Sequence, residues 1–419
     1  MSTNKIWFMA LVAALGGFLF GFDTIVINGA EQDIQRLWDL SGTMHGWVVS
    51  SALWGTVVGA LAGGWIADRF GRKPTLCAVG LLYFVSALWS ALAGGPVALM
   101  LARLIGGFGV GISTIAAPVY IAEISPAESR GKLTALFQFN IVIGVVAALA
   151  SNLLLKDAGA NAWRWMLGAE CVPAALFLSL ASFLVESPRY LASQTLQTPQ
   201  TLQTSQTSQT SQTSQTSQTF FSRANLRPIL LAFFVAFFNQ MSGCNAINYF
   251  APRIFQMAGL GRSAAFLSTF GLGFLQAAAT FGGLWLIDRI GRKSLLIVGG
   301  IGYVVSLFAA TAFFAVGNGP WAAVSIFVFL ASHGLGQGTV IWVLISEVFP
   351  QRFRAQGQAL GASTHWVFAA LVALFFPIAA EAVPAWSIFA FFGVMMVVHL
   401  LWAWFVVPET RGRALEDIA

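Results

Sequence analysis

The sequence predicts an all-α membrane protein of twelve transmembrane helices arranged as two six-helix bundles. Three observations lead to this prediction. The chain of 419 residues is 57% hydrophobic and only 9% charged, whereas soluble domains are near 25% charged. Its mean hydropathy is +0.76, and apolar runs of about 20 residues, the length that crosses the hydrocarbon core, recur twelve times. Three motifs of the first half also return in the second half.

The apolar runs are separated by short connections that contain Gly, Pro and charged residues. We expect the spans, in chain order, at 6–29, 44–67, 75–93, 97–122, 133–154, 164–185, 226–250, 264–287, 294–316, 321–346, 357–380 and 385–407. The first run is too long for the apolar core of a signal peptide, so we expect it to remain as a helix. Connections such as Gly94–Pro96 and Gly317–Pro320 predict hairpin turns between neighbouring spans.

The repeated motifs indicate a duplicated six-helix unit. They are Asp68–Lys73 and Asp288–Lys293 at an offset of 220, Glu123–Pro126 and Glu347–Pro350 at 224, and Glu186–Arg189 and Glu409–Arg411 at 223. Each motif follows the equivalent span of its half. Because six is an even number, both copies have the same orientation and are related by an axis along the membrane normal.

The two halves are joined by a segment of different composition. Residues 1–192 form the N-terminal six-helix bundle, residues 193–222 a low-complexity linker, and residues 223–419 the C-terminal bundle. The linker consists almost entirely of Ser, Thr and Gln, so it has no apolar face to bury, and we expect a disordered cytoplasmic segment.

The net charge of +6 could suggest a nucleic-acid binder, but the positions of the basic residues argue against one. When loops are assigned alternately to the two sides, one side collects sixteen Lys and Arg residues and the other only five. This asymmetry predicts a multi-pass protein of the cytoplasmic (inner) membrane with both termini in the cytoplasm. The three cysteines lie far apart in apolar runs, without metal-ligand spacing, so we expect no metal and no cofactor.

Acidic and basic residues recur at fixed spacing at the predicted cytoplasmic helix ends. We interpret them as a charge network that spans the two bundles, stabilises a state closed toward the cytoplasm and breaks when that side opens. Positive charge that only sets the topology is the alternative. The predicted gating residues are Asp68, Arg69, Arg72, Glu123, Arg130, Glu186, Arg189, Asp288, Arg289, Arg292, Glu347 and Arg354.

With these repeats the sequence resembles the major facilitator superfamily and, within it, the sugar porter family, over the whole chain except the linker. The resemblance rests on Gly17–Asp23, Arg103–Gly111, Glu186–Arg189, Gln240–Ala246 and Val407–Arg413, which occur together and in the family's order. It implies a secondary transporter that works by alternating access, and bacterial proton–pentose and proton–hexose symporters are the most similar members. Their linkers carry several short amphipathic helices, which this chain lacks.

Asp23 lies deep in the first span, where a carboxylate costs a few kcal/mol unless it is paired or protonated. Arg103, early in the fourth span, is its natural partner. The resemblance implies that Asp23 carries the proton, that Arg103 tunes it, and that Glu170 in the sixth span modulates the pair. A static ion pair that only joins helices is the alternative.

A sugar site needs amides for the hydroxyl groups and aromatic side chains for the apolar ring face. The seventh span offers Asn239, Gln240, Asn245 and Tyr249, interrupted by Ser242 and Gly243, and a broken helix near mid-membrane is where substrate is expected. The resemblance implies further sugar contacts. The complete predicted substrate set is Gln138, Asn239, Gln240, Asn245, Tyr249, Gln276, Trp342, His365 and Trp366.

Departures from the family pattern leave the identity of the sugar open. Asn239 stands where Gln is usual, and His365 where Asn or Gln is common, so His365 could hydrogen-bond or titrate. His333 either lines the cavity or is a core histidine. A passive sugar facilitator and a sensor that binds sugar without moving it remain alternatives to proton-coupled uptake by a monomer. The sequence contains no nucleophile–base pair or phosphate-binding loop, so an enzyme is not expected.

Overall fold

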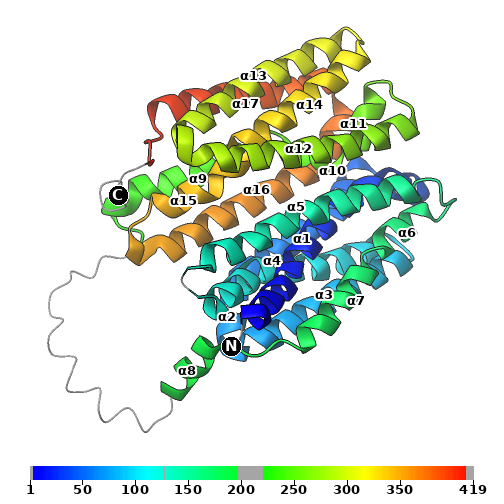
Figure 1. The fold of residues 1–419 in the computed structure, drawn as a ribbon. Helices are drawn as coiled ribbons and strands as arrows, with labels where there is room; N and C mark the ends of the chain where they lie inside the picture. Colours follow the sequence, from blue (N-terminus) through cyan, green and yellow to red (C-terminus); the bar gives the residue numbers. More distant parts are fainter. Residues whose placement is uncertain (1–2, 127, 197–219, 412–419) are drawn as a thin grey trace.

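The computed structural model describes residues 3–126, 128–196 and 220–411 (Figure 1). Within these ranges the chain is helical and contains no strand, as predicted. Twelve segments are long and apolar enough to cross a membrane, so the predicted count is confirmed. Most of the predicted linker, residues 197–219, lies outside the described residues.

The N-terminal half contains the first six spans. Its elements are α1 (Thr3–Leu37), α2 (Gly42–Phe70), α3 (Arg72–Leu92), α4 (Pro96–Ile124), α5 (Arg130–Leu155), α6 (Ala162–Gly168) and α7 (Cys171–Ser182), followed by the short α8 (Pro188–Leu196). The predicted end of the first span, residue 29, was wrong by eight residues, because α1 continues through the polar sequence up to Leu37. The other span ends agree within three residues. The division of the sixth span at residues 169–170 was not predicted.

The C-terminal half repeats this order. Its elements are the 3₁₀ turn η4 (Arg223–Asn225), α9 (Leu226–Met241), α10 (Cys244–Tyr249), α11 (Ala251–Met257), α12 (Arg262–Ile290), α13 (Arg292–Ala315), α14 (Gly319–Leu335), α15 (Gln337–Glu347), η5 (Gln351–Phe353), α16 (Arg354–Ala382) and α17 (Ala385–Phe405). The predicted break in the seventh span is confirmed, since Gly243 separates α9 from α10 with a φ of 81°. A second break, at Gly336 between α14 and α15, was not predicted.

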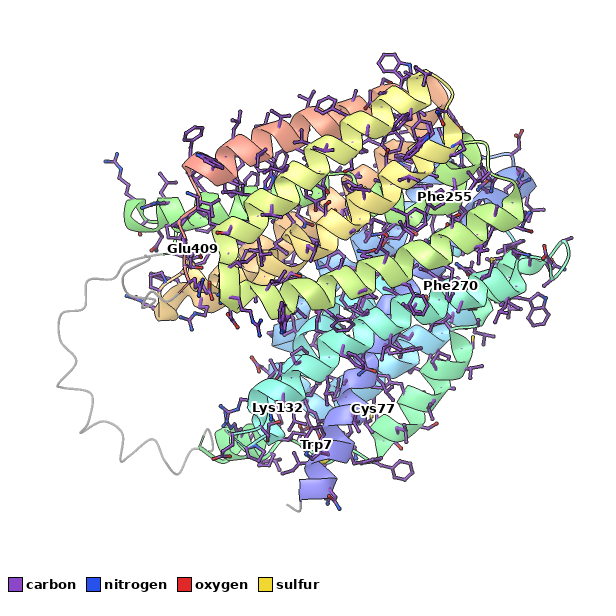
Figure 2. All side chains as sticks on the ribbon, turned by 45° about the horizontal axis from the view of Figure 1, so that its top comes forward. Trp7, Cys77, Lys132, Phe255, Phe270 and Glu409 are labelled. Carbon is purple, nitrogen blue, oxygen red and sulfur yellow. The ribbon has the colours of Figure 1, made fainter. Side chains whose placement is uncertain are left out.

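The two halves pack differently at the two ends of the molecule. We call the end that carries α8, the start of α1 and the end of α17 the linker end, and the end with α6 and α11 the far end (Figure 1). At the far end one apolar core contains residues of both halves, for example Phe22 and Val26 with Phe250 and Phe376. Toward the linker end each half has an apolar core of its own. Lys132 and Glu409, at the linker ends of the two halves, lie apart (Figure 2).

Two glycines in α1 determine how closely α1 and α5 approach each other. A Cβ atom at Gly17 would meet the backbone carbonyl of Phe137, and one at Gly21 would meet that of Ile141. Only glycine therefore permits this contact. Because Asp23 follows directly in α1, the close packing fixes the depth and direction of its carboxylate inside the N-terminal half.

Candidate functional site

A buried ion pair lies in the core of the N-terminal half. Arg103 on α4 donates from Nη1 to Asp23 Oδ1 at 2.6 Å and from Nη2 to the Asp23 backbone carbonyl at 2.7 Å. Asp23 is 0% exposed and Arg103 is 2% exposed. The predicted pairing of these residues is thus present in the structure. The second carboxylate oxygen, Asp23 Oδ2, has no hydrogen-bond partner among the described residues.

A second buried acid accompanies this pair. Glu170 precedes α7 at the break in the sixth span, is 1% exposed, and is in electrostatic contact with both Asp23 and Arg103. Its Oε1 has no hydrogen-bond partner in the described part of the chain. Tyr249, on α10 of the other half, is 3% exposed and also lies within electrostatic range of Asp23 and Arg103. One guanidinium therefore faces two carboxyl groups in a dry environment.

The polar residues of the broken seventh span form an amide cluster in the C-terminal half. Gln240 donates from Nε2 to Asn239 Oδ1 at 2.8 Å and accepts at Oε1 from Asn245 Nδ2 at 2.8 Å. Its Nε2 also lies 3.1 Å from His365 Nδ1 on α16. Gly243, with a φ of 81°, interrupts the helix between Gln240 and Asn245, and side chains on both sides of this break meet. Four predicted sugar-contacting residues are therefore brought together.

Aromatic rings cover this cluster. The His365 ring lies 5.0 Å from the Trp342 ring and 4.9 Å from the Trp366 ring, measured between centroids. Trp366 also packs against Phe20 on α1, with 5.7 Å between the ring centroids. This contact joins the two halves near the middle of α1 and α16. Among the described residues, the side chains of Gln138 and Gln276 form no hydrogen bond with the cluster, so their role stays a prediction. His333 bonds Tyr303 at 2.6 Å instead, inside its own half.

The predicted gating residues form two matching networks at the linker end, one in each half. In the N-terminal half Arg72 forms a bidentate pair with Glu123 at 2.9 and 3.1 Å and contacts Asp68 at 3.0 Å. In the C-terminal half Arg292 pairs with Glu347 at the same two distances and with Asp288 at 2.9 Å. The structural repeat thus reproduces the sequence repeat at the level of individual bonds.

A further carboxylate in each network binds backbone N–H groups beside the arginine. Glu186 accepts hydrogen bonds from the backbone N–H groups of Arg72 and Lys73, and Glu409 accepts from those of Arg292 and Lys293. Burial alone would raise the pKa of Glu409, but the backbone N–H groups of Arg411, Arg292 and Lys293 hold this pKa below its ordinary value. Glu409 was absent from the predicted gating residues, although the repeat offset from Glu186 points to it.

The expectation that one charge network spans the two bundles was wrong for this conformation. Among the described residues no ion pair joins the halves at the linker end, because the halves lie apart there. Arg69 and Arg289 stack on the rings of Trp65 and Trp285. The remaining predicted gating residues, Arg130, Arg189 and Arg354, form no ion pair in the described part of the chain.

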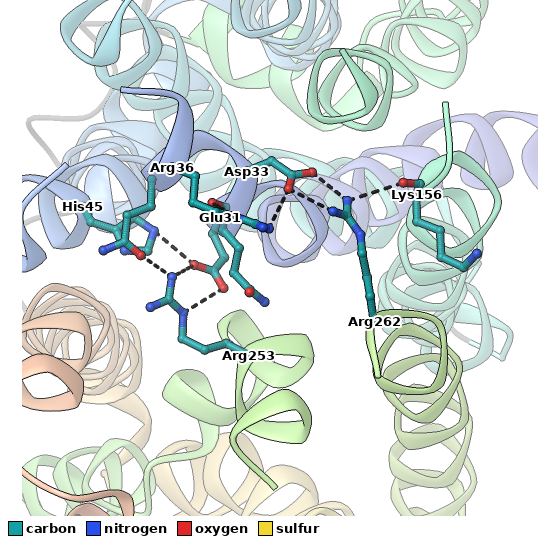
Figure 3. Close-up of polar contacts among 9 residues, drawn as sticks. Glu31, Asp33, Arg36, His45, Lys156, Arg253 and Arg262 are labelled. Carbon is teal, nitrogen blue, oxygen red and sulfur yellow. Dashed lines mark hydrogen bonds and ion pairs between the residues drawn. The ribbon is translucent and has the colours of Figure 1, made fainter. Parts of the chain in front are cut away.

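Charged residues that the sequence analysis did not select join the halves at the far end (Figure 3). Arg253 on α11 donates to both oxygens of Glu31 on α1, at 3.1 and 2.7 Å, and Arg262 on α12 donates to Asp33 at 2.8 Å. Glu381 on α16 accepts from the Gly42 backbone N–H at 2.9 Å. The signal for the first pair was available, since Glu31 and Arg253 are 222 positions apart, which lies within the range of 220 to 224 spanned by the offsets of the repeated motifs.

Comparison with known proteins matches nearly the whole chain to a single family. A family model described as "Sugar (and other) transporter" matches residues 9–419. The D-xylose-proton symporter of Escherichia coli (strain K12) is 30% identical over 474 residues, which cover 100% of this chain and 96% of that protein. The glucose transporter GlcP of Staphylococcus epidermidis is 34% identical over 439 residues, which cover 100% of this chain and 97% of that protein.

Solved structures agree with this result. The inward open conformation of the xylose transporter XylE from E. coli matches with a TM-score of 0.85 at 30% sequence identity, and the match covers 99% of each chain. The arrangement of twelve spans in two halves and the overall relation of the halves are therefore similar to those of that structure.

Proposed function

Because this chain belongs to the sugar (and other) transporter family, we propose that it imports a monosaccharide together with a proton by alternating access. The chain is a multi-pass membrane protein with twelve apolar spans, and its relatives include a D-xylose-proton symporter and a glucose transporter. A pentose or a hexose fits the names of these two relatives and also the amide cluster.

The charge balance of the buried cluster in the N-terminal half is the observation that carries the proton coupling. Asp23 and Glu170 are two carboxyl groups, and among the described residues Arg103 is the only cation in contact with them. If both acids were ionised, a net negative charge would remain in a dry environment, which is costly. The cluster is neutral when one proton is bound, so it takes up a single proton.

The sugar is bound by the amide cluster of the C-terminal half. The side chains of Asn239, Gln240 and Asn245 exchange hydrogen bonds with each other and can exchange these for bonds to sugar hydroxyl groups. Trp342 and Trp366 offer flat apolar surface for the face of the sugar ring. Tyr249 belongs to the span that holds the amides, yet it lies within electrostatic range of Asp23 and Arg103. Tyr249 therefore links the occupancy of the sugar site to the charge of the proton site.

The linker end faces the cytoplasm and the far end faces outside. This orientation follows from the alternate assignment of loops in the sequence, which gives sixteen Lys and Arg residues to one side and five to the other. The conformation is open toward the cytoplasm, since the polar contacts between the halves lie at the far end. The networks around Arg72 and Arg292 brace each bundle, 1–192 and 223–419, as it rotates, and meet when the cytoplasmic side closes. We place the protein in the cytoplasmic membrane as a monomer.

Sugar uptake by a transport-deficient host tests this function. We expect the cells to accumulate one of labelled xylose, glucose, galactose or arabinose above its outside concentration, and an uncoupler to abolish the accumulation. Addition of the sugar to unbuffered cells should make the medium more alkaline, because each sugar carries a proton inward.

The same measurements separate the alternatives. Equilibration of the sugar without alkalinisation would contradict proton coupling and indicate a passive facilitator. Binding of sugar to the purified protein without any uptake would indicate a sensor and contradict transport altogether.

A further inference from the structure

At the far end a buried acid, a buried histidine and an arginine meet at the boundary between the halves (Figure 3). Glu31 on α1 and His45 on α2 belong to the N-terminal half and are both 0% exposed. Arg253 on α11 belongs to the C-terminal half and holds both oxygens of Glu31, at 3.1 and 2.7 Å. The Nε2 atom of His45 lies 3.1 Å from Glu31 Oε2.

The imidazole of His45 is otherwise without polar neighbours. Its Nε2 faces Glu31 Oε2 at 3.1 Å, which is an ion pair when the ring is protonated, and its Nδ1 has no hydrogen-bond partner in the described part of the chain. The ring of Phe250 packs against it edge-on at 5.9 Å. Since Arg253 already balances the charge of Glu31, the closed cluster is neutral with a neutral imidazole and needs no further proton.

The neighbouring charged residues have hydrogen-bond or ion-pair partners of their own. Glu381 on α16 bonds Gln35 and the Gly42 backbone N–H, and Gln35 in turn bonds Arg253. Toward the outside, Asp33 pairs with Arg36 and Arg262. These residues line a cavity of about 540 Å³, together with Lys156 and Asp157. In the described part of the chain, Arg253 is therefore the only Lys or Arg side chain that pairs with Glu31 in the closed state.

Opening of the far end must remove this cation. Glu31 and Arg253 lie at equivalent positions of the two repeats, 222 residues apart, so they meet where the halves face each other. When the halves separate there, Arg253 leaves with the C-terminal half, whereas His45 stays beside Glu31. A buried carboxylate that loses its partner needs a new positive charge. A histidine supplies one by binding a proton in the physiological range.

We propose that Glu31 and His45 form a second proton-binding site, which binds a proton only when the far end is open and Arg253 is withdrawn. The proton and Arg253 then compete for Glu31. Acid on the outside favours the open far end, because a proton that binds only one conformation stabilises that conformation. This inference rests on the alternating access of the proposed function but not on its Asp23 coupling step.

The opening can be followed by the distance between two spin labels in full-length protein in lipid nanodiscs. Leu37 on α1 is 55% exposed and Val383 after α16 is 43% exposed, so cysteines at these positions label the far end of each half. The parent for all variants carries both labels, with the three native cysteines, Cys77, Cys171 and Cys244, replaced by alanine. Because a proton bound only by open molecules can change their ratio to closed molecules by up to about tenfold per pH unit, this ratio should rise by more than about tenfold between pH 8 and pH 5.

Variants assign this response. In Glu31→Gln the rise should disappear. In His45→Gln, which keeps the Arg253–Glu31 pair and so should fold, the rise should be smaller than in the parent, because only Glu31 remains to bind the proton. The matched control is Asp33→Asn, which removes the neighbouring pair with Arg262. It should change the ratio equally at all pH values and leave the pH response intact.

Two results would overturn the proposal: a parent whose label distances do not depend on pH, or a pH response of unchanged size in both Glu31→Gln and His45→Gln. Asp23→Asn separates this site from the coupling site. It should lose sugar accumulation but keep the far-end pH response, so a failure of the coupling step and a failure of this site give different outcomes.

Discussion

Neutralisation of Asp23 tests the proton coupling with little structural disturbance. In Asp23→Asn the amide oxygen can still accept from Arg103 Nη1, and the bond from Arg103 Nη2 goes to the backbone carbonyl, which the substitution does not touch. The geometry should therefore survive, while the carboxyl group that exchanges the proton is lost. We expect sugar to equilibrate across the membrane but no longer to accumulate.

The size of this effect follows from the charge balance of the site. One guanidinium against two carboxyl groups implies one proton per sugar, and a membrane potential of 100 mV supplies about 2.3 kcal/mol for one charge. At about 1.4 kcal/mol for each factor of ten, this free energy sustains a roughly 50-fold accumulation. In Asp23→Asn the inside-to-outside ratio of a non-metabolised sugar should fall to about 1.

The assay is accumulation of labelled sugar in energised vesicles, with counterflow exchange in the same vesicles as the control. Counterflow needs no net proton movement, so it should persist in the variant and show that the protein is folded and binds sugar. An accumulation ratio in Asp23→Asn that equals that of the wild-type protein would refute the assignment of coupling to this residue. Loss of counterflow as well would show that Asp23 is needed for the conformational change itself.

Three further predictions concern the other parts of the site. Gln240→Ala removes the amide that connects Asn239, Asn245 and His365, so the KM for sugar should rise about 10- to 100-fold at unchanged protein levels, measured by initial uptake rates. Glu409→Gln should lower the thermal unfolding temperature at pH 7. Because the pKa of Glu409 is held below its ordinary value, the difference from wild type should shrink as the pH falls through that lowered pKa, and a difference of unchanged size throughout the acid range would contradict the assignment. Gly243→Ala should destabilise the protein by about 1–2 kcal/mol and impair transport, because φ is 81° there, whereas Gly64→Ala, in open space, should change neither.

The sequence predicted most of the fold because the bilayer imposes a simple length rule. The one large error, at the end of α1, arose where the rule does not apply. Beyond Ala30 the helix continues into the polar far end, and its stability there comes from contacts such as Glu31 with Arg253 and not from apolar composition. The breaks at Glu170 and Gly336 were missed for a related reason, since hydropathy does not report local backbone direction.

The candidate site was predictable where a residue type is unusual for its position in the sequence. An aspartate and an arginine in apolar spans have few ways to be satisfied, and Asp23 and Arg103 are paired as expected. Contacts between the halves were less predictable, because they depend on conformation. The linker-end acids and bases looked like one network, yet in the state open at that end they form two. Contacts of the far end, such as that of Glu381 with Gly42, carry no local sequence pattern.

The duplication itself explains how one chain combines the proposed proton site with the proposed sugar site. Asp23 and Asn245 are separated by 222 positions, the same offset as Glu31 and Arg253, so they occupy equivalent places in the two halves. At the inner pair of positions one copy carries an acid and the other an amide, and each is embedded in a cluster of matching chemistry. At the outer pair the copies carry opposite charges and bind each other. The two copies thus differ at two pairs of positions. The difference between Asp23 and Asn245 places the proposed proton site and the proposed sugar site in different halves, and the difference between Glu31 and Arg253 joins the halves at the far end. Exchanging the charges, as Glu31→Arg with Arg253→Glu, should therefore preserve the closed far end while placing a cation beside His45, and the label distances of such a double variant should lose their pH dependence without shifting toward the open state.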